Sequence, residues 1–141
     1  MNSPILAPVV ALAGWSMVML LWMMSARAKG VQGVDPALLA RPGMRGIDLE
    51  GIVPGKAQWP SHNYNHLMEQ PTVFYAVAIV LALAGGGTGI DLYLAWAYMG
   101  LRVLHSLVQA TSNKLSIRFP LWGLSSLVLI AMTVRAGMLV F

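Results

Sequence analysis

Three polar side chains in the apolar part of the sequence are the first candidates for chemistry: Glu69, Arg102 and His105. A charged group in a membrane span costs about 2.5–3.5 kcal/mol on insertion scales, so it normally has a partner or a function. Arg102 and His105 are three residues apart and therefore share one face of a helix. A carboxylate, a guanidinium and an imidazole at one place suit an anionic ligand that also carries an amine.

The depth of these residues follows from a predicted helical hairpin whose turn centres near Gly87. Glu69 lies 18 residues before this point, and His105 lies 18 residues after it. At a rise of about 1.5 Å per residue the two stand level, with Arg102 about 4–5 Å further from the cytoplasm. We therefore expect a polar pocket open to the cytoplasm, with Arg118 at its mouth. A Glu69–Arg102 ion pair that only fixes helix packing is the alternative.

Two histidines near this pocket, His62 and His66, have the i, i+4 spacing of some metal sites. One histidine pair is a weak signal, and two interfacial histidines at the start of a helix explain it better. We therefore predict no metal site. Asn63 and Asn65 suit the N-terminal cap of the same helix. The chain has 0 cysteines, which excludes a disulfide, a thiolate metal site and a cysteine nucleophile within it.

The elements that position these residues are predicted to be membrane-spanning helices. Of the 141 residues, 57% are hydrophobic and 10% are charged, whereas soluble domains carry about 25% charged residues. Long uncharged stretches predict an all-α integral membrane protein, a single domain built as a four-helix bundle. The expected spans are residues 5–24, 63–85, 91–111 and 120–140. Pro120 suits the first turn of the fourth helix, where its missing N–H costs nothing.

The connections between the spans predict how the chain is oriented. Residues 25–62 form a loop rich in glycine and proline, in which residues 36–41 can make one short interfacial helix. Basic residues gather in this loop and again just before the fourth span, and lysine and arginine bias short loops to the cytoplasm. We expect the chain to lie in a bacterial inner membrane, with both termini outside and both basic loops in the cytoplasm. The net charge of +4 is then a topology signal, and no nucleic-acid partner is predicted.

Two segments resemble signatures of the MAPEG family, the membrane-associated proteins in eicosanoid and glutathione metabolism. The segment NHLMEQP at residues 65–71 resembles the start of the family's second helix, with its Asn, Glu and Pro. Arg102 and His105 resemble the family's Arg-x-x-His in helix three. Arg118 follows His105 by 13 residues, where glutathione-dependent members place a thiolate-stabilising arginine. Order and spacing agree over nearly the whole chain.

The resemblance implies a homotrimer that binds glutathione between protomers near the cytoplasmic face. By position, Glu69 would hold the glutathione amine, and Arg118 would be the catalytic residue that faces the sulfur. The remaining predicted ligand-binding residues are Asn65, His66, Arg102 and His105. A cation beside a thiol favours the thiolate, which is the nucleophilic form.

The sequence also departs from the family pattern, and the departures keep other functions open. Asn65 and His62 stand where glutathione-using members usually carry arginines, His66 stands where the family's Asn is most frequent, and Gln109 replaces a common tyrosine. The first hypothesis is a glutathione transferase or peroxidase that acts on lipophilic electrophiles. The second is a non-catalytic membrane subunit of a larger complex. The third is a protein that binds a lipid or another anion in the same pocket.

Overall fold

The computed structural model describes residues 3–141, and the helices account for most of them. Five helices form the body of the molecule: α1 (Leu6–Gly30), α3 (Gly55–Leu67), α4 (Gln70–Leu83), α5 (Ile90–Thr111) and α6 (Leu115–Val140). The connection between α1 and α3 contains a short helix and two 3-10 turns: α2 (Pro36–Leu39), η1 (Val31–Gly33) and η2 (Gly46–Leu49). Residues 3–141 contain no strand.

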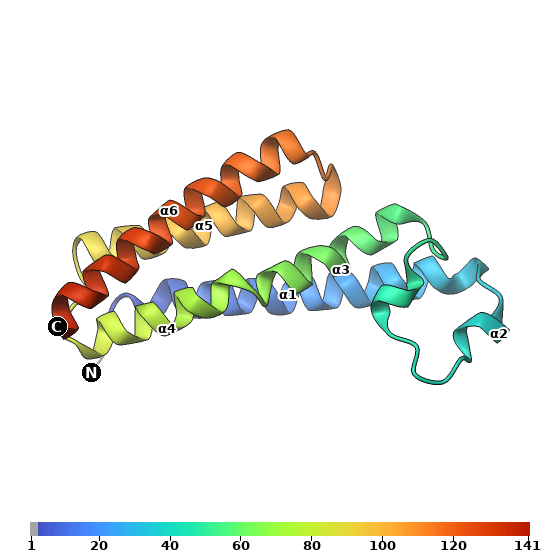
Figure 1. Cartoon of the computed structure of the whole chain (residues 1–141), viewed down its shortest axis with the longest axis horizontal. Helices are drawn as coiled ribbons and strands as arrows, with labels where there is room; N and C mark the ends of the chain where they lie inside the picture. The colour runs from blue at the N-terminus through green and yellow to red at the C-terminus, as the bar shows by residue number, and fades with distance from the viewer. Residues whose placement is uncertain (1–2) are drawn as a thin grey trace.

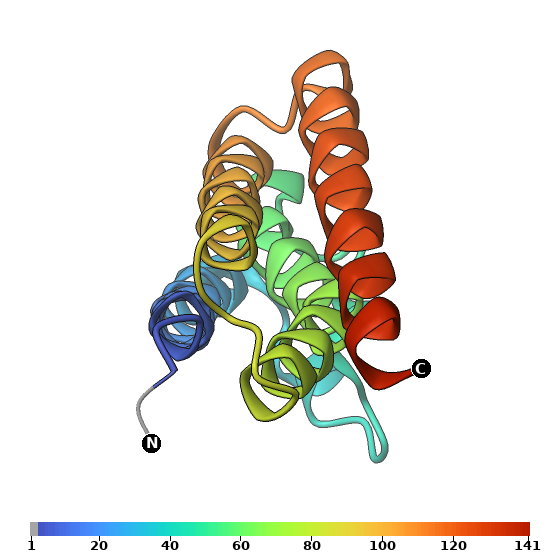
Figure 2. The same cartoon turned by 90° about the vertical axis from the view of Figure 1, so that its left-hand side faces the viewer.

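The helices form two layers, and within each layer neighbouring helices run antiparallel. α1 runs beside the rod formed by α3 and α4, and the hairpin of α5 and α6 crosses this pair at an angle (Figure 1). α5 packs against α1 and α3, whereas α6 contacts α4 (Figure 2). The α4–α5 turn and the C-terminal end of α6 lie at one end of the molecule, and the long α1–α3 connection lies at the other (Figure 1).

Three helical stretches are long and apolar enough to cross a membrane: Leu6–Gly33, Gly55–Leu83 and Leu115–Val140. α5 falls outside this group because its buried face is polar, with Asp91, Arg102 and His105 among its buried residues. At a rise of about 1.5 Å, its 22 residues still reach about 33 Å. Its exposed side chains include Tyr93 and Leu104, so the apolar face of α5 points outward.

Several helices are longer than the predicted spans. α3 begins at Gly55, so Asn63 and Asn65 lie inside it and the predicted capping role is wrong. α6 begins at Leu115, which places Pro120 inside the helix and not at its first position. The first four N–H groups of a helix have no intrahelical partner, so a proline in the second turn removes only the hydrogen bond that its own N–H would have made. The loop expected at 25–62 is correspondingly shorter, because α1 continues to Gly30.

The second predicted helix is broken at Met68 and Glu69, between α3 and α4. Pro71 has no N–H for the carbonyl of Leu67, and Glu69 adopts φ −91° and ψ −100°, outside the helical region. The hydroxyl of Thr72 donates to the Glu69 carbonyl at 2.6 Å, which closes the first turn of α4. The break matters because Glu69 lies within it and His66 lies just before it.

Buried contacts between the layers hold α5 in place. The ring of Phe74 on α4 stacks on Tyr98 of α5 with centroids 4.5 Å apart. Trp15 on α1 donates its indole N–H to the hydroxyl of Ser106 at 2.9 Å, and Asn63 on α3 donates to the same oxygen. These bonds fix the rotation of α5 about its axis, so its polar face turns toward α3.

Candidate functional site

A cavity of about 290 Å³ opens between α3, α5 and the start of α6. Its lining residues are His66, His105, Leu115, Arg118, Phe119 and Trp122. The two imidazole rings lie 5.0 Å apart, between centroids, and are tilted by 47°. The structure therefore brings together three of the predicted site residues, from three different helices, around one space.

Arg118 is held at this cavity by the turn that precedes α6. Its guanidinium donates to the side-chain oxygen of Asn113. Asn113 has a positive φ of 51°, a conformation that asparagine tolerates better than most residues. An apolar side chain at position 113 would lose the bond and strain the turn. The asparagine thus orients the guanidinium before any ligand arrives.

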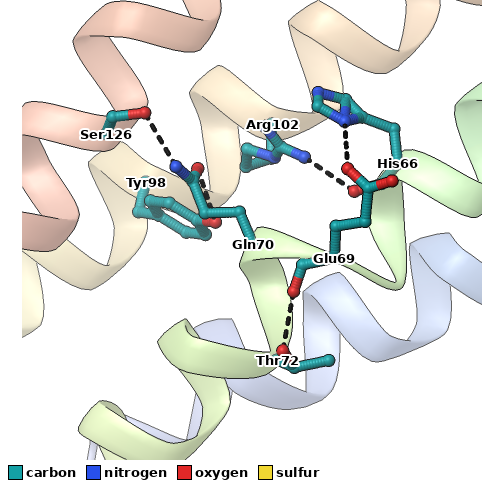
Figure 3. A network of polar contacts seen from close by, with 7 residues as sticks. All are labelled: His66, Glu69, Gln70, Thr72, Tyr98, Arg102 and Ser126. Carbon is teal, nitrogen blue, oxygen red and sulfur yellow. Dashed lines mark hydrogen bonds and ion pairs between the residues drawn. The ribbon is translucent and has the colours of Figure 1, made fainter.

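Arg102 lies behind the cavity and is fully buried, with 0% of its surface exposed. It donates through Nη2 to the carbonyl oxygen of His66 at 3.2 Å (Figure 3). This carbonyl lies at the last turn of α3, where the break leaves backbone oxygens short of helical partners. The guanidinium therefore supports the backbone of the broken helix. Its Nε and Nη1 atoms have no partner among residues 3–141.

Glu69 does not pair with Arg102 among the described residues, so the predicted alternative of a buried Glu69–Arg102 ion pair is wrong. The Glu69 carboxylate contacts Nδ1 of His66 at 3.2 Å instead, and its side chain is 70% exposed (Figure 3). The physical reason is the helix break, which turns Glu69 out of the helical register. Glu69 borders the site from outside the bundle.

Asn65 lies apart from these residues. It is exposed and borders a different cavity, which also contains Arg27 and His62. Neighbouring residues of a helix are about 100° apart around its axis, which is why Asn65 and His66 face different spaces. His62 contacts Glu50 at 2.6 Å and does not join His66. Within residues 3–141, no group of three or more histidine, aspartate and glutamate side chains gathers as a metal site would require.

One polar connection near the site has no counterpart in the sequence analysis. Gln70 accepts a hydrogen bond from the Tyr98 hydroxyl at 3.3 Å and donates to the Ser126 hydroxyl at 2.7 Å (Figure 3). It thereby joins α4, α5 and α6 just below the break. The sequence did contain a signal for this connection, because a glutamine such as Gln70 is uncommon in an apolar span.

An apolar groove of about 450 Å³ continues from this connection along α6. Gln70, Ser126 and Thr133 are its polar lining residues, and Val73 and Val134 are among its apolar ones. Trp122 borders both the groove and the cavity of His66 and His105. The two spaces are therefore neighbours, one that contains the Arg118 guanidinium and one that is apolar.

The comparison with protein families identifies one family. The model of the MAPEG family matches residues 5–138, which is nearly the whole chain. No curated protein matches the chain, and no solved structure does. The family match, together with the apolar helices, makes the chain an integral membrane protein. The order of the polar residues along α3, α5 and α6, and the extent of the match, lead to one conclusion: this chain belongs to the MAPEG family.

Proposed function

We propose that the protein is a membrane-bound glutathione transferase or peroxidase that acts on lipophilic electrophiles. The observation that carries the proposal is the cavity in which His66, His105 and Arg118 meet. The family contains glutathione-dependent transferases and peroxidases and also non-catalytic members, so the match limits the function to this range. The cavity favours the catalytic part of the range because it is cationic and adjoins an apolar groove.

The chemistry assigned to the chain is the activation of a thiol. The Arg118 guanidinium favours the thiolate of bound glutathione, and the thiolate sulfur attacks the electrophilic carbon of the substrate. A carbon–sulfur bond forms while the leaving group departs with its electron pair. Glu69 offers an exposed carboxylate for the glutathione amine. The apolar groove beside Trp122 supplies room for a substrate that arrives from the bilayer.

The exposure of Glu69 supports a homotrimer whose sites lie between protomers. Glu69 sits near the middle of the apolar stretch Gly55–Leu83, yet its carboxylate is largely uncovered in the single chain. A carboxylate that faced lipid here would carry a large desolvation cost. A second copy of the chain against this face would remove the carboxylate from lipid and complete the site.

We further propose that α5 crosses the membrane as the fourth span, with the basic loops in the cytoplasm. Its polar face is buried in the bundle and its outer face is apolar, as a helix within a bundle requires. The chain has 0 cysteines, so single cysteines can report topology. Thr88→Cys and Ser112→Cys, at the two ends of α5, should react with an impermeant maleimide from opposite sides. Labelling of both from one side would overturn the four-span arrangement.

Binding and turnover test the enzymatic proposal directly. Calorimetric titration of glutathione into detergent-purified trimer should show binding, and Glu69→Gln should weaken it about 10- to 100-fold by removing a charge-assisted hydrogen bond. Arg41→Gln, in the exposed loop far from the cavity, is the matched control and should bind as the wild type does. No binding at millimolar glutathione, together with no turnover of an aromatic halide, would end the proposal.

A non-catalytic membrane subunit is the second candidate. Asn65 favours it, because this residue stands in the place of a family arginine and borders a different cavity. Gentle solubilisation followed by native electrophoresis distinguishes the two. A reproducible co-purifying protein, combined with absence of thiol binding, would favour the subunit. A trimer without other components would argue against it.

A further inference from the structure

The η2 turn lies beside the last turns of α1, although it follows them by almost twenty residues along the chain. Gly46 of η2 packs so closely on the Arg27 guanidinium that a Cβ atom there would collide with it. On the other side, Nε2 of Gln58 on α3 donates to the Gly46 carbonyl at 3.4 Å. The connection thus runs out to α2 at the far end of the molecule and then turns back toward the bundle (Figure 1).

This return brings η2 to the depth of the lipid headgroups. Residues 4–26 carry no charged side chain, so Arg27 is the first charge after the apolar part of α1. At a rise of about 1.5 Å per residue, Arg27 lies only about 4–5 Å beyond Met24 along the helix. Trp59 is next to Gln58 on α3, and tryptophan is typical of the membrane interface. The η2 turn therefore lies level with the headgroups that surround α1.

One apolar side chain of this turn points away from the protein. Among the large apolar residues of the segment 31–54, only Ile47 is exposed, and 63% of its surface is uncovered. The rest of its side chain borders the polar cavity of Arg27, so the protein covers the inner side of the turn. A single exposed isoleucine in water needs no explanation. At headgroup depth, however, the uncovered side of Ile47 faces the boundary between headgroups and acyl chains.

Exposed cations lie close to the same level. Gly30 and Ala57 are in close contact, because a Cβ atom on the glycine would be 2.9 Å from that of Ala57. Their neighbours Lys29 and Lys56 are therefore close in depth, and both are exposed. Arg45, directly before η2, has a side chain that is 76% exposed. Cations at this depth attract anionic headgroups, and each is worth a factor of about five in membrane binding.

We propose that the η2 turn docks on the surface of the bilayer that α1 crosses. Ile47 enters the boundary between headgroups and acyl chains, and Lys29, Lys56 and Arg45 meet the phosphates of anionic lipids. Docking fixes the connection from its outer side, where no other element of residues 3–141 covers it. Neither the family match nor the proposed thiol chemistry assigns this turn a role. The proposal is independent of glutathione binding.

Spin-label accessibility tests the depth of Ile47 directly. The chain has 0 cysteines, so Ile47→Cys carries a single nitroxide label on the full-length protein. The protein is placed in nanodiscs of phosphatidylcholine and phosphatidylglycerol, and collisions with oxygen and with a water-soluble nickel chelate are measured. Oxygen concentrates in lipid and the chelate in water. We expect a ratio of oxygen to nickel collisions several-fold higher at position 47 than at the control Ala37→Cys, an exposed position on α2.

Two outcomes would overturn the proposal. Free access of the nickel chelate to the label at position 47, equal to that at position 37, would place η2 in water. Low access of both oxygen and nickel to position 47 would mean that protein covers Ile47, as a second copy of the chain would. High oxygen access with low nickel access is the only pattern that supports a lipid contact.

Trypsin provides a second measurement on the chain without a label. Within the segment 31–54 trypsin is expected to cut only after Arg45, because Pro42 protects the bond after Arg41. In the same nanodiscs Ile47→Ser should be cut about tenfold faster than the wild type, since docking protects this bond. Ile47→Leu should be cut as slowly as the wild type, because lipid requires an apolar surface and no fixed shape. Equal rates for the wild type and Ile47→Ser would contradict docking.

The lipid composition tests the part played by the cations. Replacement of phosphatidylglycerol by phosphatidylcholine should accelerate cleavage of the wild type about fivefold or more. The double variant Lys29→Gln and Lys56→Gln should lose most of this dependence. Lys114→Gln, an exposed cation in the α5–α6 turn, is the matched control and should keep it. A wild-type rate that ignores the anionic lipid, or an equal loss in Lys114→Gln, would refute a docking surface centred on η2.

Discussion

Replacement of Arg118 by glutamine tests the assignment of the thiolate-stabilising residue. The cavity that Arg118 lines has a volume of about 290 Å³. A sphere of that size has a radius of about 4 Å, so a sulfur atom inside it lies about 4–8 Å from the guanidinium. At an effective dielectric constant of about 20, the Coulomb attraction between the guanidinium and a thiolate at this distance is about 2–4 kcal/mol. Loss of the cation should therefore raise the pH midpoint of thiolate formation by about 1.5–3 pH units.

The assay is the ultraviolet absorbance of the thiolate, recorded against pH for glutathione bound to the detergent-purified protein. Arg118→Lys retains the charge and should keep the midpoint within about 1 pH unit of the wild type. Arg41→Gln controls for the general loss of one positive charge. An unchanged midpoint in Arg118→Gln, with glutathione still bound, would refute the role of Arg118 and transfer the stabilisation to the imidazoles.

Three further changes test the framework around the site. Tyr98→Phe removes the hydrogen bond to Gln70 and should lower the free energy of unfolding by about 0.5–1.5 kcal/mol, measured by denaturation in detergent. Arg102→Met removes the donor from the His66 carbonyl, and amide exchange at the helix break should become about 10- to 100-fold faster; unchanged exchange would mean that the guanidinium does not support the break. The pKa of Asp48, in the connection between α1 and α3, is held below its ordinary value of 3.8 by the backbone N–H and the guanidinium of Arg45. A lowered pKa stabilises the folded loop above pH 3.8, and this contribution is lost as the pH falls through the lowered pKa; proteolysis of the loop should accelerate there, and Asp48→Asn should abolish the pH dependence.

The helix break separates what local sequence could and could not predict. Pro71 predicts a break in the helix, because a proline removes one helical hydrogen bond. Its consequence is tertiary: the carbonyl of His66 receives Arg102 from α5, and Glu69 turns outward. Residue spacing put Glu69, Arg102 and His105 at one depth, but spacing carries no information on which way a side chain turns at a break. The predicted ion pair failed for that reason.

The start of α3 shows a similar limit of prediction from local sequence. Glycine, proline and polar residues made 55–62 look like loop, yet these residues form the first turns of α3. Their helix is stabilised by packing against α1, where Gly30 lies so close to Ala57 that a Cβ atom on the glycine would be 2.9 Å from it. Propensity is a weak prior when tertiary contacts of this kind exist.

The sequence by itself determined the membrane character, the order of the helices and the family. Uncharged apolar runs and isolated polar residues are properties of the chain, and they persist whatever the packing. Only the tertiary structure decided which polar residues meet. It joined His66, His105 and Arg118 around one cavity, and it moved Asn65 to the cavity of Arg27. The physical reason is rotation: one residue along a helix turns a side chain by about 100°, and only contacts between helices fix that angle.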